Sequence, residues 1–406
     1  MDGGKGKNKL PRNVWVVAVT SFFTDVSSEM VVNLLPLFLN NVLGVRTSVI
    51  GLIEGVAESV ASLLKVFSGW ISDRLGMRKW LAVIGYTVST LSKPVYYFAS
   101  TWGVVAGARW GDRMGKGIRT APRDALVADS VDAKQRGYAF GFHRAADTAG
   151  AFIGLIIAFV AVWFLQGSGN RLKAHTFRVL VLVSLIPAAL AVLTLAFGAR
   201  DVRPSEKAAK PRFGFLSLGR RFAFFMVVIG IFELGNSSDA FLVLRAQQKG
   251  LSIFGIIGML IAFNLVYALV SVPAGKLSDR IGRKTVIAVG WGFYALIYLG
   301  MAMAGTALHV VVLYVFYGFY YGLTYGTAKA LVADIVEPEL RGIAYGTYNA
   351  VLGIFDLPAS LIAGVLWSGV GSWKGFGPSA PFFFGAAMAL TALAMLLFWK
   401  PVRYSR

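Results

Sequence analysis

The sequence predicts an all-α polytopic membrane protein in which 12 transmembrane helices form two six-helix bundles. Of the 406 residues, 56% are hydrophobic and only 15% are charged, whereas a soluble domain carries about 25% charged residues. Long apolar runs at 179–197, 286–304 and 382–399 approach the ~20 residues needed to cross a bilayer. The two halves of the chain also share sequence at a nearly constant offset, which is typical of an internal duplication.

The apolar runs order the spans along the chain. The first is expected to be a membrane helix and not a removed signal peptide, because it holds Asp25 and Glu29 and shows no clear cleavage site. The expected spans are 14–43, 48–71, 80–100, 102–127, 137–166, 177–199, 222–247, 253–275, 285–304, 308–333, 342–369 and 380–400. The polar segment 200–221, with two prolines and seven basic residues, is expected to link an N-terminal bundle, 1–199, to a C-terminal one, 222–406.

Basic residues concentrate on one side of this arrangement. The loops on the side of both termini hold 24 lysines and arginines, and the alternate loops hold six. This asymmetry predicts that both termini and the linker are cytoplasmic. It accounts for much of the net charge of +20, which would otherwise favour nucleic-acid binding, so no nucleic-acid partner is expected. The chain has no cysteine, so its redox compartment cannot be inferred.

Three pairs of segments carry the internal repeat. GWISDRLGMRK at 69–79 returns as GKLSDRIGRK at 275–284, ALVADSVDAKQRGYAFG at 125–141 returns as ALVADIVEPELRGIAYG at 330–346, and SSE at 27–29 returns as SSD at 237–239. Because the offsets stay between 205 and 210 residues, the halves are expected to be parallel copies of about six helices each.

The first pair resembles the signature loop of the major facilitator superfamily, which reads GxxSDRxG followed by basic residues between the second and third helices of each half. Together with the 12 spans, the duplication and the basic central segment, the resemblance covers essentially the whole chain. It implies a two-bundle secondary transporter that works by alternating access. It also implies a substrate site between the bundles at mid-membrane.

In that family, the signature aspartate and its basic neighbours latch the cytoplasmic side by pairing with nearby helix ends. The resemblance carries this gating role to Asp73, Arg74, Arg78, Asp129, Asp279, Arg280 and Arg283, with Gly76, Gly282 and Lys284 as the remaining signature positions. In the first copy Met77 occupies a position that is usually basic, so the contact there either passes to Arg78 or weakens. The alternative is that all these residues only form a tight, positively charged turn.

The segment 108–129 holds eight charged side chains in 22 positions. It could be a cytoplasmic loop, a nucleic-acid-binding arm or a membrane helix. By the repeat, it matches the apolar tenth span, which predicts a helix. At ~100° per residue, seven of its charged residues fall within an arc of about 140°, and apolar residues cover the opposite face. We therefore expect a membrane helix with one cationic face.

Basic residues outnumber acidic ones on that face by five to two, and charges within a membrane are tolerated only where they pair or face water. Unpaired cations predict an anionic ligand. The expected charged substrate-binding residues are Arg109, Arg113, Lys116 and Arg144. The alternative is a buried network that holds the N-terminal bundle together. We expect Arg113 and Lys116 to be unpaired, and Arg109 to pair with Asp112.

Other spans supply further candidate site residues. Asp25 and Glu29 on the first span stand four residues apart and share one face, and they are the first candidates for proton coupling. His143 and Asp147 on the fifth span, also four apart, are the second candidates. On the tenth span, Tyr317 and Tyr321 belong to a cluster of five tyrosines that could line the substrate site, although such clusters more often serve helix packing.

A second motif bears on the choice of substrate. Arg109, Gly115 and Gly117 resemble a fourth-helix motif of proton-coupled efflux members of the superfamily. Those members often have Gln and Gly where this chain has Asp112 and Arg113. This difference disfavours a drug-efflux function.

The expected function is a proton-coupled secondary active transporter that moves a small organic anion or an acidic amphipathic molecule across the cell membrane as a monomer. One alternative is a drug/proton antiporter for cationic or neutral compounds. The alternative outside this class is a transporter-like sensor that moves nothing. The sequence shows no metal-ligand spacing, phosphate-binding loop or nucleophile–base pair, so neither an enzyme nor a cofactor is expected.

Overall fold

The computed structural model describes residues 10–132, 135–202, 218–337 and 340–399. Within these ranges the chain forms helices and no strand. The helices are α1 Arg12–Glu29, η1 Val32–Leu34, α2 Leu35–Asn41, α3 Thr47–Leu75, α4 Arg78–Phe98, α5 Trp102–Asp129, α6 Arg136–Gln166, α7 Ala174–Gly198, α8 Arg220–Gly235, α9 Ala240–Gln248, α10 Ile253–Ile281, α11 Arg283–Met303, α12 Ala307–Asp334, α13 Arg341–Ser368 and α14 Ala380–Phe398. Most of the expected linker, 203–217, lies outside the described residues.

These helices make 12 spans, which confirms the predicted fold class. α1, η1 and α2 together form the first span, and α8 with α9 forms the seventh. By length and composition, nine of the spans in the described ranges are apolar enough to cross a membrane. The other three are α3, α4 and α5, and α5 packs between α3 and α4. Their polar residues therefore face neighbouring helices, and this is why hydropathy alone does not identify these three helices as membrane spans.

α5 confirms the helix predicted over the charged segment 108–129. It approaches α4 closely because glycines meet at the crossing. A Cβ atom added to Gly115 would lie 2.5 Å from the carbonyl oxygen of Gly85. Small residues at a crossing let two membrane helices pack backbone to backbone, and this contact fixes the direction in which the charged face of α5 points.

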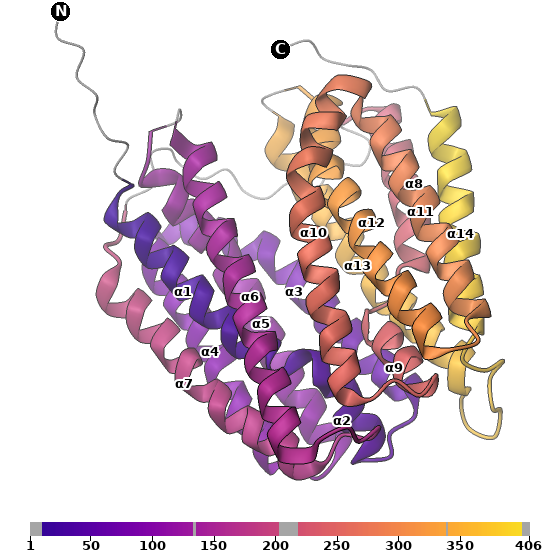
Figure 1. Ribbon diagram of the computed structural model, residues 1–406. Coiled ribbons are helices and arrows are strands. Elements are labelled where there is room, and N and C mark those ends of the chain that lie inside the picture. Colours follow the sequence, from indigo (N-terminus) through magenta and orange to yellow (C-terminus); the bar gives the residue numbers. More distant parts are fainter. Residues whose placement is uncertain (1–9, 133–134, 203–217, 338–339, 400–406) are drawn as a thin grey trace, which may run out of the picture.

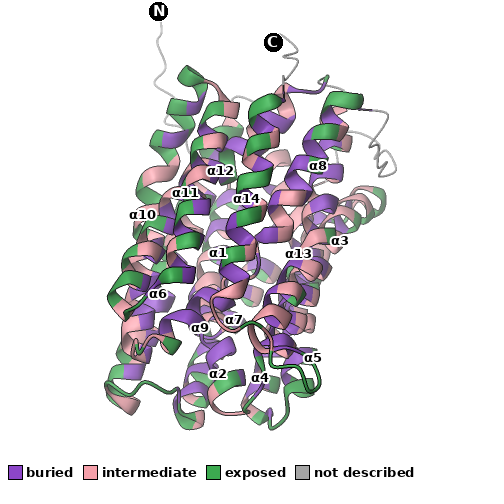
Figure 2. Cartoon of the chain, turned by 90° about the vertical axis from the view of Figure 1, so that its right-hand side faces the viewer, coloured by how far each residue is buried: buried purple, intermediate pink, exposed green. Residues whose placement is uncertain are grey.

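The helices form two groups, α1–α7 and α8–α14 (Figure 1). The first helix begins and the last helix ends at the same end of the molecule, which we call the terminal end. Large apolar side chains such as Phe197 on α7 and Phe398 on α14 are exposed, while buried residues gather where helices face one another (Figure 2). An exposed apolar belt of this kind is suited to lipid.

The two groups touch mainly along α3 with α13 and α6 with α10, and also where α2 meets α9. At the α3–α13 contact, a Cβ atom added to Gly364 would lie 2.5 Å from the Thr47 carbonyl oxygen. At the α6–α10 contact, the rings of Phe159 and Phe254 lie with centroids 3.8 Å apart and planes tilted by 34°. All four residues lie toward the end opposite the termini, so the molecule is closed there.

The signature segments differ from their expected form. α3 and α10 run several residues beyond their predicted ends, so Asp73 and Asp279 lie in the last turns of helices and not in loops. The chain then turns at Gly76 and Gly282, whose φ angles are +65° and +96°. Because side chains disfavour positive φ, glycine is the residue suited to both helix ends.

The first and seventh spans are both interrupted. The first breaks between α1 and α2, where Pro36 occupies the first turn of α2. Proline suits that position because its missing N–H has no partner in a first turn. The seventh span breaks between Gly235 and Ala240. These breaks fall beside the repeated SSE and SSD segments, so acidic residues stand at equivalent interruptions in the two halves.

Candidate functional site

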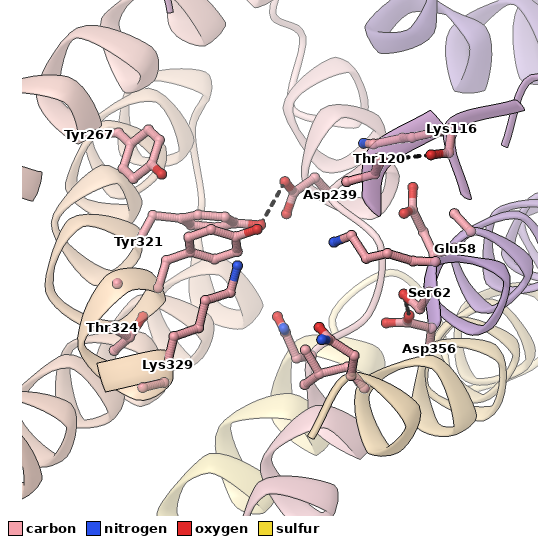
Figure 3. A pocket seen from close by; sticks show the side chains of 18 of the residues that line it. Glu58, Ser62, Lys116, Thr120, Asp239, Tyr267, Tyr321, Thr324, Lys329 and Asp356 are labelled. Carbon is pink, nitrogen blue, oxygen red and sulfur yellow. Dashed lines mark hydrogen bonds between the residues drawn. The ribbon is translucent and has the colours of Figure 1, made fainter. Parts of the chain in front are cut away.

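A cavity of about 1280 Å³ lies between the two groups of helices. Its lining extends from Pro36 in the first broken span to Asp279 and Arg283 near the terminal end. Since α3 and α13 close the opposite end, the cavity opens toward the termini. Figure 3 shows side chains from both groups directed into this space, including Lys116, Asp239, Tyr321 and Lys329.

A buried ion-pair network joins α5 to α3 along the cavity wall. Arg109 donates to both carboxylate oxygens of Glu54, with Nε–Oε1 at 3.1 Å and Nη2–Oε2 at 2.6 Å. Glu58 lies 3.5 Å from the same guanidinium. Asp112, the partner expected from the sequence, is farther away at 3.7 Å. Arg109 is thus held mainly by the second span.

Arg113 is paired, and the expectation that it is a free cation is wrong. Its Nη2 lies 3.0 Å from Glu58 Oε1, and the residue is only 9% exposed. Glu58 therefore bridges two arginines of α5. Glu54 and Glu58 stand four residues apart and so share one face of α3, but only the packing of α3 against α5 shows which basic residues they meet.

Lys116 is in a different position from Arg109 and Arg113. Its side chain is exposed to the cavity and, among the described residues, no carboxylate lies within 4.0 Å of it. Arg119 hydrogen-bonds to Ser89 and stacks over the Tyr86 ring at 4.5 Å. Arg144, on α6, donates to the Tyr267 hydroxyl across the two groups at 2.7 Å. Lys116 is thus the residue of this wall that is best placed to meet a ligand.

The two acid pairs predicted for proton coupling differ in their surroundings. Asp25 lines the cavity, but Glu29 does not and instead accepts a hydrogen bond from Asn33 at 2.7 Å. His143 and Asp147 line the cavity together, 3.6 Å apart. The His143 Nε2 atom also lies 2.8 Å from the Ser21 hydroxyl. The structure thus brings Asp25, His143 and Asp147 to one cavity wall and leaves Glu29 behind it.

The wall from the C-terminal half is rich in carboxylates that hydroxyl or amide groups satisfy. Asp239, at the break between α8 and α9, accepts hydrogen bonds from Tyr317 at 3.1 Å and Tyr321 at 3.2 Å. Tyr321 lines the cavity, whereas Tyr317 is fully buried behind it. Two more carboxylates line the same wall, with Glu233 bonded to Asn236 and Asp356 bonded to Ser62. The predicted site lacked all three carboxylates. The repeat of SSE as SSD was the signal for Asp239.

The gating candidates form the same three-residue cluster in each half. Arg78 contacts Asp73 at 2.6 Å and Asp129 at 2.5 Å. In the second copy, Arg283 contacts Asp279 at 3.6 Å and Asp334 at 3.0 Å. Arg78 stands two residues after its glycine and Arg283 stands one after, so the extra Met77 is accommodated and the contact passes to Arg78. Asp334 was missed, although it ends the repeated ALVAD segment.

Arg74 and Arg280 do not take part in these clusters. Arg74 lies over the Trp70 ring at 5.5 Å. Within the described ranges, neither arginine has a carboxylate within 4.0 Å. The same ranges contain no group of three or more acidic, histidine or cysteine side chains able to hold a metal ion.

Comparison with known proteins identifies the family. A family model described as the Major Facilitator Superfamily matches residues 17–354 and 224–406. The chain belongs to this superfamily. It is a multi-pass membrane transporter, as a relative from Methanocaldococcus jannaschii also indicates. That relative, an uncharacterized MFS-type transporter, is 35% identical over 397 residues, which cover 96% of this chain and 95% of that protein.

Other relatives are less similar in sequence. A multi-drug resistance efflux pump homologue of Lactococcus lactis is 27% identical, over 87% of this chain and 89% of its own length. The cis,cis-muconate transport protein of Acinetobacter baylyi is 23% identical, over 84% and 82%. A solved POT family transporter shares the superfamily fold with a TM-score of 0.79 at 13% identity, covering 97% of each chain.

Proposed function

We propose that this superfamily member is a secondary active transporter of an organic anion or an acidic amphipathic molecule. The observation that carries the proposal is Lys116, a cation of α5 that is exposed to the cavity with no carboxylate within 4.0 Å among the described residues. An ammonium group that faces a cavity between helices without a nearby carboxylate is free to bind a charge of opposite sign. An acidic group of the substrate would satisfy it.

The charge balance of the surrounding wall supports the same ligand. Among the described residues of the N-terminal half that line the cavity, seven are lysine or arginine and five are acidic. Arg109 and Arg113 form ion pairs with Glu54 and Glu58, so their role is to hold α5 against α3. Lys116 and Arg144, which have no carboxylate within 4.0 Å in those ranges, remain for the substrate.

We propose proton coupling through the cavity carboxylates of the same wall. Asp25 lines the cavity and, in the described ranges, no basic side chain lies within 4.0 Å of its carboxylate. Such a group can gain or lose a proton as the cavity fills and empties. His143 and Asp147 form the second candidate pair. Movement of the two helix groups, which we divide at the segment 200–221, would expose the site alternately to each side of the cell membrane.

A drug/proton antiporter remains the second candidate, and a specific feature favours it. Tyr267, Tyr321 and the carboxylate of Asp239 would suit a cationic aromatic compound. The Lactococcus lactis relative is named as an efflux pump homologue, whereas the Acinetobacter baylyi relative is named for a dicarboxylate. The two candidate functions differ in the charge of the substrate: an anion would bind at Lys116, whereas a cation would not.

Uptake into proteoliposomes tests the proposal, with cis,cis-muconate and caproate as anionic probes and a lipophilic amine as the cationic probe. We expect an imposed pH gradient to drive anion uptake by the wild type. Lys116→Gln should abolish this uptake. The matched control is Lys329→Gln, which removes a cavity lysine that lies over the Tyr325 ring at 4.7 Å. Uptake of the amine alone, unaffected by Lys116→Gln, would establish the antiporter instead. If an anionic or a cationic probe binds but is not taken up under a pH gradient of either direction, the protein would be a sensor.

A further inference from the structure

The two walls of the cavity carry opposite net charge. In the described residues, the N-terminal half contributes seven basic and five acidic side chains to the lining, and the C-terminal half contributes two basic and four acidic ones. The lining as a whole has equal numbers of acidic and basic side chains, because the net charges of the two walls are equal and opposite. A ligand in the cavity therefore meets a basic surface on one side and an acidic surface on the other.

Each wall carries charged side chains without an ion-pair partner in the described ranges, and Lys116 and Asp239 are among them. Lys116 projects from α5, and Asp239 projects from the interruption between α8 and α9 (Figure 3). Both line the cavity, and among the described residues neither has an oppositely charged side chain within 4.0 Å. The two tyrosine hydroxyls that bond to Asp239 hold its carboxylate in place without neutralising it.

A ligand with a single negative charge would satisfy only one of these groups. Once its acidic group meets Lys116, the carboxylate of Asp239 still lacks a cationic partner, and it repels any negative charge that the ligand brings into the same cavity. A ligand that also carries an ammonium group removes this conflict. Tyr321, which lines the cavity and donates to Asp239, adds an aromatic ring beside that carboxylate that favours an organic cation.

We propose that the substrate is zwitterionic, with its acidic group at Lys116 and its ammonium group at Asp239. This inference rests on the proposed function, because it assigns the same acidic group to the same lysine. It adds a subsite on the opposite wall. A bipolar ligand would also contact both helix groups at once, so its binding would favour drawing the two walls together.

Direct pairing of Lys116 with Asp239 in another state of the transporter is the competing explanation. In that case the two side chains would serve closure and not ligand recognition. The explanations differ in selectivity. A closing contact affects all substrates equally, whereas a recognition site affects only ligands that carry the matching charge.

The test measures binding of straight ω-amino acids, from γ-aminobutyrate to ε-aminocaproate, and of the matching carboxylates without the amine. We expect at least one amino acid to bind the purified protein about tenfold more tightly than its carboxylate, as one charged hydrogen bond would supply. Asp239→Asn should remove this preference and leave carboxylate affinity unchanged or higher. Lys116→Gln should weaken both ligands. Glu337→Gln, which removes an exposed carboxylate at the terminal end outside the cavity lining, is the control and should keep the preference.

Melting temperatures of the ligand-free variants separate these effects from misfolding. If no amino acid binds more tightly than its carboxylate, the zwitterion proposal is overturned while anion transport stands. Equal loss of both ligand types in Asp239→Asn would also overturn it and favour the closing contact. Binding of hexylamine that Lys116→Gln leaves intact, with no binding of either acid, would instead overturn the proposed function itself.

Discussion

Arg109 on α5 and Glu54 on α3 form a two-point ion pair in which the arginine side chain is 2% exposed and the glutamate 4%. Such a pair couples the folding of two helices, because removing one partner leaves the other charge buried. That loss typically costs about 3–5 kcal/mol. We therefore predict that Arg109→Gln and Glu54→Gln each lower the melting temperature strongly, and that the double variant recovers most of the loss. Asp112→Asn should have a smaller effect, since Asp112 is 3.7 Å from the guanidinium. Equal effects of all three single changes would contradict this ranking.

Neighbouring basic residues on α5 should separate into two classes. Arg113→Gln leaves Glu58 with only its longer, 3.5 Å contact to Arg109, and the Glu58 side chain is 36% exposed, so we predict a loss of stability of about 1 kcal/mol and partial rescue by Glu58→Gln. Lys116→Gln strands no partner, so its melting temperature should equal or exceed that of the wild type while anion uptake is lost. Thermal unfolding of the purified variants, with and without ligand, provides the measurement. A destabilised Lys116→Gln would reveal a partner that this conformation lacks.

The paired clusters at the terminal end should control the rate of transport. We predict that Arg78→Gln and Arg283→Gln slow uptake about tenfold, as expected for roughly 1.5 kcal/mol of lost charged contact. Substrate affinity should change little, because Arg78 is not part of the cavity lining and Arg283 lies at its mouth. Arg74→Gln is the control, since that arginine contacts an aromatic ring and not a carboxylate. A large loss of affinity in Arg78→Gln would mean that the cluster shapes the binding site.

Labelling of single cysteines should establish the orientation in the membrane. The chain has no native cysteine, so Glu337→Cys at the terminal end and Ser372→Cys at the opposite end can be introduced without background. Both positions are exposed. The excess of basic residues at the terminal end predicts that an impermeant thiol reagent labels Ser372→Cys in intact cells and labels Glu337→Cys only after permeabilisation. The reverse labelling pattern would show that the terminal end faces the outside of the cell.

The fold followed from local properties of the sequence. Hydropathy located most spans, and the repeat identified α5 as a helix despite its charges. The partners of those charges did not follow, because pairing depends on the rotation of one helix against another. Arg113 shows the difference. Helical geometry placed it on the cationic face, but only the approach of α3, set by packing, brings Glu58 to 3.0 Å. Asp239 shows a second limit, because its tyrosine partners come from α12, about 80 residues away in the chain.

The seam between α3 and α13 has a thermal consequence. Where Gly364 lies against Thr47, backbone meets backbone, and no large side chain separates the two helices. Separating α3 from α13 at this point would expose peptide groups and only a small apolar surface. Apolar exposure raises the heat capacity and polar exposure lowers it, so the two contributions offset at this contact. The enthalpy of opening this contact should accordingly change less with temperature than the enthalpy of unfolding the helices that form it.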